Sequence, residues 1–156
     1  MQAITRFSIR TGEETSASNQ FHIKPFFDGK PSDLILSGDT IEYQYDLGGS
    51  YLVITHYDYW EGTSYWFNLL DRSLNLLDII APPEQSGFIQ DLRPYEDHGL
   101  EFSFFNKPAR WRLCALDRPH WDFRPGTAFQ RPFRYWLTRR YLTLDRLPAP
   151  SASGIE

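Results

Sequence analysis

Hydrophobic and polar residues follow a strand-like pattern most clearly between residues 51 and 80. Three runs rich in β-branched and aromatic residues are separated there by two short turn signals, Glu61-Gly62 and Asp71-Arg72-Ser73. Such residues favour strands, and short polar turns between them are typical of antiparallel hairpins. The pattern therefore predicts a β-meander, in which each strand pairs with the next one along the chain.

The predicted meander has a definite register. If Glu61-Gly62 form a two-residue turn, Ile54 lies opposite Leu69 and Val53 lies opposite Leu70. Aliphatic residues then meet at the base of the first hairpin, where we expect the core. The pairs expected nearer its tip are His56 with Phe67, Tyr57 with Trp66, and Asp58 with Tyr65.

The second turn of the meander is predicted from the same apolar matching. Pairing Leu70 with Leu76 also places Phe67 opposite Ile79, whereas a loop of even length would set Phe67 against Asp78. Because successive side chains of a strand point to opposite faces, a shift of one residue would turn the apolar set towards water. An odd loop length is therefore expected.

The tip of the first hairpin is the main candidate contact surface. It combines aromatic rings with carboxylates, a mixture that is costly to leave in water and common at protein interfaces. The candidate partner-binding residues are Tyr57, Asp58, Tyr59, Trp60, Glu61, Tyr65 and Trp66. An alternative interpretation is that these rings pair across the strands and cover the core.

Composition extends the β prediction to the rest of the chain. The 156 residues include 12 Phe, 9 Tyr and 5 Trp, which favour strands, and 11 Pro and 10 Gly, which favour turns. We expect a mainly β fold: a single antiparallel domain over residues 1–147, with at most one short helix, and a flexible tail over 148–156. A meander-containing sandwich and a partly open barrel are both compatible with the pattern.

Other strands are less sharply defined by the sequence. Further strands are expected over 4–10, 20–27, 34–36, 40–45, 100–105 and 110–116, with the last ones over 133–147. Residues 88–92 fit a strand or a helical turn, and residues 134–140 could begin a helix. Residues 117–132 are rich in Pro, Arg and aromatic residues and are typical of a long ordered loop.

The net charge of −4 is unevenly distributed along the chain. Residues 1–100 hold 15 acidic and 6 basic residues, and residues 101–156 hold 5 acidic and 10 basic ones. Acidic strands could pair with basic strands inside one folded sheet. Alternatively, one charged face could meet a partner of opposite charge.

Arginine and aromatic residues alternate in the C-terminal third, as in Arg110-Trp111-Arg112. Small β domains bind single-stranded nucleic acid with aromatic stacking platforms beside arginine, so this function is an alternative. The overall acidity and the presence of only three lysines weigh against it.

Catalytic and metal-binding signals are weak. The segments Glu96-Asp97-His98 and His120-Trp121-Asp122 could each supply metal ligands or a general base, but turn or solvent-exposed roles explain them more simply. Cys114 would lie on the same strand face as Arg110 and Arg112, which would lower its pKa, although a lone cysteine is usually a small core residue. We therefore expect no catalytic residue, no cofactor and no metal, and an enzymatic or ligand-binding barrel remains a further alternative.

The cellular location can be predicted only from sequence features that are absent. No apolar run approaches the 18 residues or so of a membrane-spanning helix, and the segment MQAITRFSIRTGEE has no apolar signal core. The single cysteine leaves no internal disulfide. These features favour the cytoplasm.

Residues 34–80, with their aromatic-tipped meander and the segment NLLDRSLNLLDII, resemble small cytoplasmic β-rich bacterial proteins. Some of these are immunity proteins of polymorphic or contact-dependent toxin systems. The resemblance implies a cofactor-free protein that binds and blocks one cognate toxin domain. It covers about a third of the chain and carries no family site over to particular residues.

Overall fold

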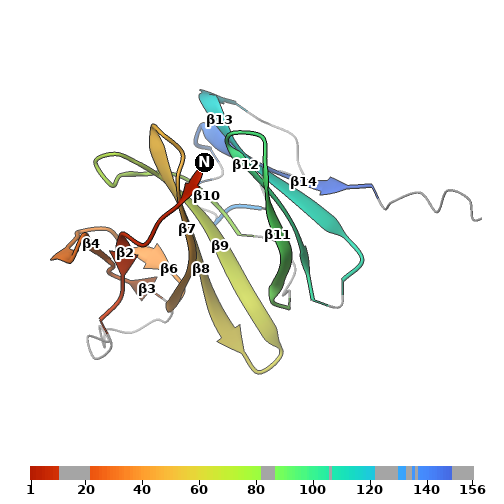
Figure 1. Ribbon diagram of the computed structural model, residues 1–156, viewed down its shortest axis with the longest axis horizontal. Coiled ribbons are helices and arrows are strands. Elements are labelled where there is room, and N and C mark those ends of the chain that lie inside the picture. The colour runs from red at the N-terminus through yellow and green to blue at the C-terminus, as the bar shows by residue number, and fades with distance from the viewer. Residues whose placement is uncertain are drawn as a thin grey trace, which may run out of the picture.

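The computed structural model describes residues 1–10, 22–81, 87–105, 107–121, 130–132, 135 and 137–148. Over these described residues the fold is mainly β, with several antiparallel sheets, no closed barrel and essentially no helix, which confirms the predicted class. Figure 1 shows two large sheets side by side and a group of short strands beyond the first of them. The single-domain boundaries remain a prediction, and most of the predicted tail lies outside the described residues.

The first sheet has five strands in the order β1-β7-β8-β9-β10. Its strands are β1 (Gln2–Ala3), β7 (Thr40–Asp46), β8 (Ser50–Tyr59), β9 (Gly62–Asp71) and β10 (Leu76–Ile80). Strands β8, β9 and β10 pair in sequence order, so the predicted meander is present. The strand expected over 40–45 is also present as β7.

The second sheet has four strands in sequence order and packs face to face against the first. Its strands are β11 (Ile89–Tyr95), β12 (Gly99–Phe104), β13 (Arg110–His120) and β14 (Arg140–Leu147). The segment over 88–92 is therefore a strand and not a helical turn, and β12 and β13 form the predicted hairpin. Leu52, Ile54 and Phe67 of the first sheet meet Leu100, Phe102 and Leu113 of the second in one core.

Six two-residue strands lie in the described part of residues 1–37, where longer strands are predicted over 4–10 and 20–27. Apart from β1, these are β2 (Phe7–Ser8), β3 (His22–Ile23), β4 (Phe26–Phe27), β5 (Lys30–Pro31) and β6 (Leu36–Ser37). They form two small sheets, and their apolar residues pack with Tyr51, Val53 and Leu70 on the other face of the first sheet. Strands β8 and β9 are thus buried on both faces, which explains their nearly continuous apolar sequence.

The first turn of the meander lies two residues away from its predicted register. Tyr59 pairs with Gly62, so Trp60 and Glu61 form the turn, and Ile54 lies opposite Phe67 instead of Leu69. Gly62 has a φ of 152°, which side-chain-bearing residues rarely adopt, so the glycine is required just after the turn and not within it. Because the offset is two residues, every side chain keeps its predicted face.

The second turn begins as predicted and then departs from the prediction. Leu70 pairs with Leu76, but a β-bulge follows and places Asp78 opposite Leu69 and Ile80 opposite Phe67. The predicted pairing of Phe67 with Ile79 is therefore wrong. The bulge turns Asp78 towards the second sheet, where its side chain is fully buried.

Asp78 is buried because it joins the two large sheets. Its carboxylate accepts hydrogen bonds from Nε and Nη2 of Arg131, both at 2.9 Å. It also accepts the backbone N–H groups of Tyr141 at 2.8 Å and Leu142 at 2.9 Å, at the start of β14. Both side chains of this ion pair are at least 98% buried. This network, which we call the clasp, fixes the edge of the first sheet against the edge of the second.

Candidate functional site

The hairpin of β8 and β9 extends past its neighbours on both sides. Strand β7 pairs with β8 only as far as His56, and β10 pairs with β9 only as far as Phe67. The remaining part, residues 57–66, is here called the arm. Figure 1 shows the arm projecting from one end of the molecule. An isolated two-stranded hairpin is marginally stable in water, so the arm depends on contacts made by its faces.

The seven predicted contact residues lie in the arm but not on one surface. Tyr57, Tyr59 and Trp66 share the face that carries Val53 and Leu70, which we call the outer face. Asp58 and Tyr65 lie on the inner face, which points towards the second sheet. Trp60 and Glu61 form the turn at the end. Because the register differs from the predicted one by two residues, this division between two faces is the one that the predicted register implies.

Trp60 is the most exposed large apolar side chain of the described residues. It is 96% exposed and occupies the turn at the far end of the arm. Behind it on the outer face, the rings of Tyr57 and Tyr59 stand edge to face with centroids 4.9 Å apart. The outer face and the turn therefore present an ordered group of rings with one indole fully in water.

Tyr65 anchors the arm to the second sheet. Its side chain is buried, its ring lies 5.8 Å from that of Phe104, and its hydroxyl oxygen accepts the backbone N–H of Ile89 at 3.1 Å. Burial raises the pKa of Tyr65 well above its ordinary value, so the hydroxyl stays protonated. For this residue the structure supports the alternative interpretation, in which the ring covers the core.

A polar cluster that the sequence did not indicate lies at the base of the arm. Nδ1 of His56 is 2.9 Å from Oε2 of Glu42, and Nε2 of His56 is 3.8 Å from Oδ2 of Asp58. Glu42 occupies a bulge in β7 between Ile41 and Tyr43. Its distance of 14 residues from His56 explains why local pattern reading missed the pair. The cluster places two carboxylates beside one imidazole at the open end of the sheet.

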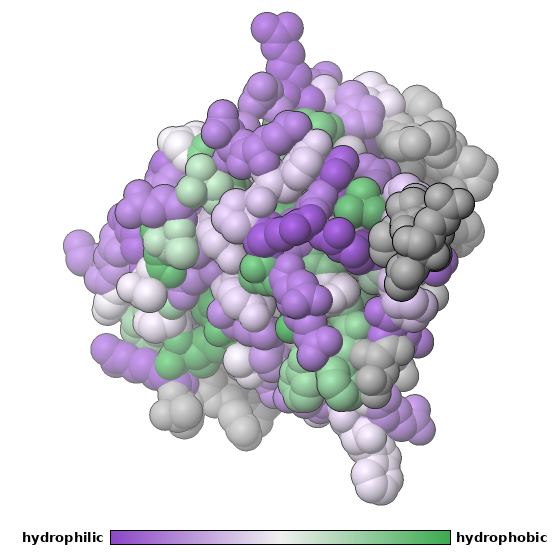
Figure 2. Space-filling view, turned by 45° about the vertical axis from the view of Figure 1, so that its right-hand side comes forward, coloured by the Kyte–Doolittle hydropathy of each residue, from purple (hydrophilic) through white to green (hydrophobic). Residues whose placement is uncertain are grey.

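The arginine-rich part of the chain forms a second candidate surface on the outside of the second sheet. Glu101 is buried there beneath three guanidinium groups and accepts five hydrogen bonds from Arg93, Arg110 and Arg112, between 2.6 and 3.1 Å long. Arg112 and Arg93 hold the pKa of Glu101 below its ordinary value. Arg112 also lies 3.7 Å from the ring centre of Tyr95. Figure 2 shows strongly hydrophilic groups gathered near the middle of the face turned to the viewer.

The residues considered for catalysis do not form a shared site. Cys114 is half-buried, and burial raises the pKa of its thiol despite Arg112, which is opposite to the expected activation. His98 is 3.9 Å from Asp117 at an exposed position, and His120 lies opposite Arg140. Asp122 lies outside the described residues. Over the described ranges, no group of three His, Cys, Asp or Glu residues is placed to hold a metal ion.

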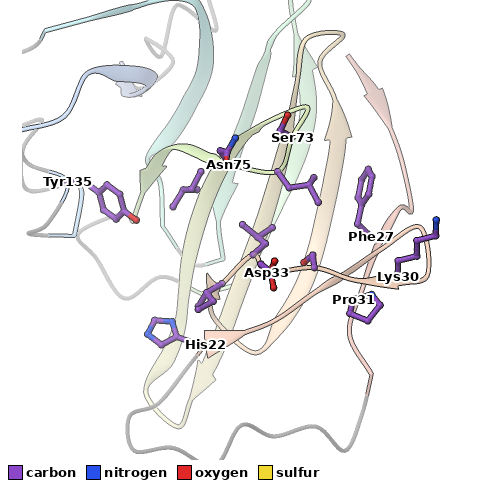
Figure 3. Close-up of a pocket in the computed structure, with 13 residues that line it drawn as sticks. His22, Phe27, Lys30, Pro31, Asp33, Ser73, Asn75 and Tyr135 are labelled. Atoms are coloured by element: carbon purple, nitrogen blue, oxygen red, sulfur yellow. The ribbon is translucent and has the colours of Figure 1, made fainter.

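An open groove of about 1040 Å³ lies between the N-terminal strands and the turn joining β9 to β10. Figure 3 shows its polar lining residues, which come from separate segments: His22, Lys30, Asp33, Ser73, Asn75 and Tyr135. No ion pair joins His22 to Asp33 in the described part of the chain. Ser73 and Asn75 serve the turn itself, because their backbone N–H groups donate to Asp71. The groove therefore offers scattered polar groups and no converging set.

Comparisons of the chain with protein-family models, with curated proteins and with solved structures gave no match. Within the described residues, no helix has the length and apolar character needed to cross a membrane. Function must therefore be inferred from the arm and from the arginine-covered sheet face.

Proposed function

We propose that the protein is a non-enzymatic protein-binding module and that the arm forms part of its binding surface. The observation that carries the proposal is the exposure of Trp60. This side chain is 96% exposed at the end of a hairpin that extends beyond the paired parts of β7 and β10. Tryptophan is enriched at interface hot spots, and covering such a ring removes a large apolar area from water. The geometry favours contact with a partner over a packing role.

Six of the seven predicted contact residues belong to this proposed surface. They are Tyr57, Asp58, Tyr59, Trp60, Glu61 and Trp66. Tyr65 supports the surface from beneath through its contacts with Phe104 and Ile89. The rings of Tyr57 and Tyr59 are already packed against each other, so ordering these two side chains on binding would cost little entropy.

In its most concrete form, the proposal is that the protein is a bacterial immunity protein. It would bind and neutralise a cognate toxin domain in the cytoplasm. Two features support this form: the resemblance of residues 34–80 to such proteins, and the carboxylates of Asp58 and Glu61 beside the exposed ring. An acidic surface with aromatic anchors suits a basic target such as a nuclease.

Single-stranded nucleic-acid binding is ranked below protein binding. The face of the second sheet does carry Arg93, Arg110 and Arg112, but the carboxylate of Glu101 accepts hydrogen bonds from all three. Trp111, which the sequence suggested as a stacking platform, packs against the core. Arg93, Arg110, Arg112 and Trp111 thus have structural partners already.

The proposal is tested by affinity capture from the native host with the wild-type chain and two variants, followed by mass spectrometry. Trp60→Ala should weaken binding of a single stoichiometric protein partner roughly thirtyfold, or about 2 kcal/mol, with little change in melting temperature. Leu137→Ala is the matched control, because Leu137 is 81% exposed but lies outside the arm. Equal capture by all three chains would contradict the proposal, and nucleic acid as the only captured species would favour the alternative.

A further inference from the structure

The arm has an open backbone edge along β8. In an antiparallel pair, alternate residues direct their backbone N–H and C=O groups away from the partner strand. The carbonyl of His56 accepts the N–H of Asp39 at 3.0 Å, on the side of β7. Asp58, two residues further, has the same orientation. Among the described residues no strand pairs with β8 beyond His56, so within this part of the chain the backbone groups of Asp58 have no strand partner on that side.

The β8 side of the arm is also its more exposed side. Asp58 and Thr63 lie opposite each other, and the hydroxyl of Thr63 donates to Asp58 at 2.8 Å. The side chain of Asp58 is 56% exposed, whereas Thr63 on β9 is only 3% exposed. A strand approaching the arm in the plane of the sheet would therefore have access at β8.

The charge around this edge is strongly negative. Residues 31–71 contain seven acidic residues and no lysine or arginine. Two of the seven have partners elsewhere, because Arg72 pairs with Asp46 and Asn75 donates to Asp71. At the arm and the adjoining start of β7 remain Asp39, Glu42, Asp58 and Glu61, with His56 as the one basic side chain among them.

We propose that the β8 edge of the arm receives an extended, basic segment of the partner as an added strand. This inference rests on the proposed function and names how the partner is recognised. Main-chain hydrogen bonds to Asp58 would supply affinity, as in other cases of β-strand addition. A second copy of this chain is a poor occupant, since it would place the same carboxylates opposite each other, and like charges at such positions are destabilising.

The two faces of the arm set the sequence of the added strand. The residue opposite Asp58 lies on the inner face, where a lysine or arginine would meet the carboxylates of Asp58 and Glu42. Its two neighbours lie on the outer face beside Tyr57 and Tyr59, where apolar side chains fit. The segment should therefore alternate basic and apolar residues.

The probe for this inference is a short synthetic peptide that alternates lysine and valine, titrated into the whole protein at low ionic strength. Nuclear magnetic resonance should show shifts confined to residues 57–60 and slower hydrogen exchange at the Asp58 amide. The corresponding glutamate–valine peptide should not bind. Asp58→Asn should weaken binding about two- to fivefold, from the loss of one cross-strand charge pair. Asp145→Asn, an exposed aspartate on β14, is the matched control.

A version of the peptide that is N-methylated along one edge separates backbone pairing from charge attraction. The inference requires that this peptide bind much more weakly than the unmodified one. Equal binding of the two, shifts centred on the second sheet, or no binding would overturn it. These outcomes do not affect the proposed function as long as Trp60→Ala still weakens capture of the partner. The proposed function itself would be overturned only if capture did not depend on Trp60.

Discussion

Asp78 shows how far the environment of a residue can differ from what its neighbours in sequence suggest. It stands between Leu77 and Ile79 and reads as the solvent-facing position of an alternating strand. In the fold it is fully buried and bonded to Arg131, which is 53 residues away. No local pattern identifies that partner, and a carboxylate is rarely buried without one.

The clasp gives a direct prediction at this scale. Asp78→Asn removes the charge but keeps the shape, so the buried Arg131 loses the carboxylate that it contacts at 2.9 Å. Breaking one partner of a buried ion pair costs about 3–5 kcal/mol, so the free energy of unfolding in urea should fall by that amount. Asp145→Asn, at an exposed position, should change it by less than about 0.5 kcal/mol. Equal urea midpoints for both variants would show that the clasp does not stabilise the fold.

At the scale of elements, the sequence predicts the pairing of β8, β9 and β10 and of β12 with β13, but not the details of their turns. The apolar runs on either side of residues 60–62 locate the first hairpin, because burial on both faces requires them. The sequence predicts the turn at Glu61-Gly62, whereas in the structure Trp60 and Glu61 form the turn and Gly62 follows it. The bulge at Leu77 goes with the burial of Asp78 in the distant clasp, and the position of Glu42 beside His56 goes with the bulge in β7. Long-range contacts thus decide what local propensity leaves open.

The turn that leads into β7 tests whether a glycine is needed for its φ angle or for a close approach. Gly29 and Gly38 both have positive φ angles, at 76° and 102°. A Cβ on Gly29 would meet no atom within 4 Å, but one on Gly38 would lie 2.8 Å from the backbone oxygen of His56. Gly29→Ala should therefore cost about 1–2 kcal/mol from φ strain alone.

Gly38→Ala should destabilise the protein by more than Gly29→Ala, because the start of β7 must also move away from β8. Thermal and urea unfolding of the two variants give the comparison. If Gly38→Ala proves no worse than Gly29→Ala, the close approach of Gly38 to the backbone oxygen of His56 is not a constraint on the base of the arm. If it is worse, the exchange of arm amides should also become faster.

For the whole molecule, the strands of the first large sheet carry acidic residues without lysine or arginine, while neighbouring strands of the second sheet carry both signs of charge. Strands β7–β10 all come from the acidic part of the sequence, while β13 and β14 come from the basic part, where β14 pairs with β13 and β13 pairs with β12. The acidic and basic parts meet in the clasp between Asp78 and Arg131. This arrangement leaves the arm acidic and the outside of the second sheet rich in arginine. Acidic and basic side chains do face each other across strands of the second sheet, where Glu101 lies opposite Arg93 and Arg112, but not across strands of the first sheet.

The dependence of stability on acidic pH should reveal the contribution of Glu101 on the arginine-covered face. The pKa of Glu101 lies below its ordinary value of 4.5 in the folded protein, chiefly because Arg112 and Arg93 donate to it. At pH values between the folded and the unfolded pKa of Glu101, the unfolded chain binds more protons than the folded protein. The stabilisation that the ionised Glu101 gives the fold is therefore present above about pH 4.5 and is lost as the pH falls further. Urea midpoints measured from pH 6 downwards should decrease in that range. Glu101→Gln should lower the midpoint at pH 6 and flatten the decrease, and an unchanged slope would contradict the assignment.

Hydrogen–deuterium exchange of the protein with and without its captured partner tests the central claim most directly. The account predicts slower exchange of the amides of residues 57–66 in the complex, with the strongest change at Asp58 and around Trp60. Amides on the outside of the second sheet, around Glu101, should keep the exchange rates of the free protein. Protection confined to β11–β14, with the arm exchanging as fast as before, would contradict the claim and place the working surface on the arginine-covered face.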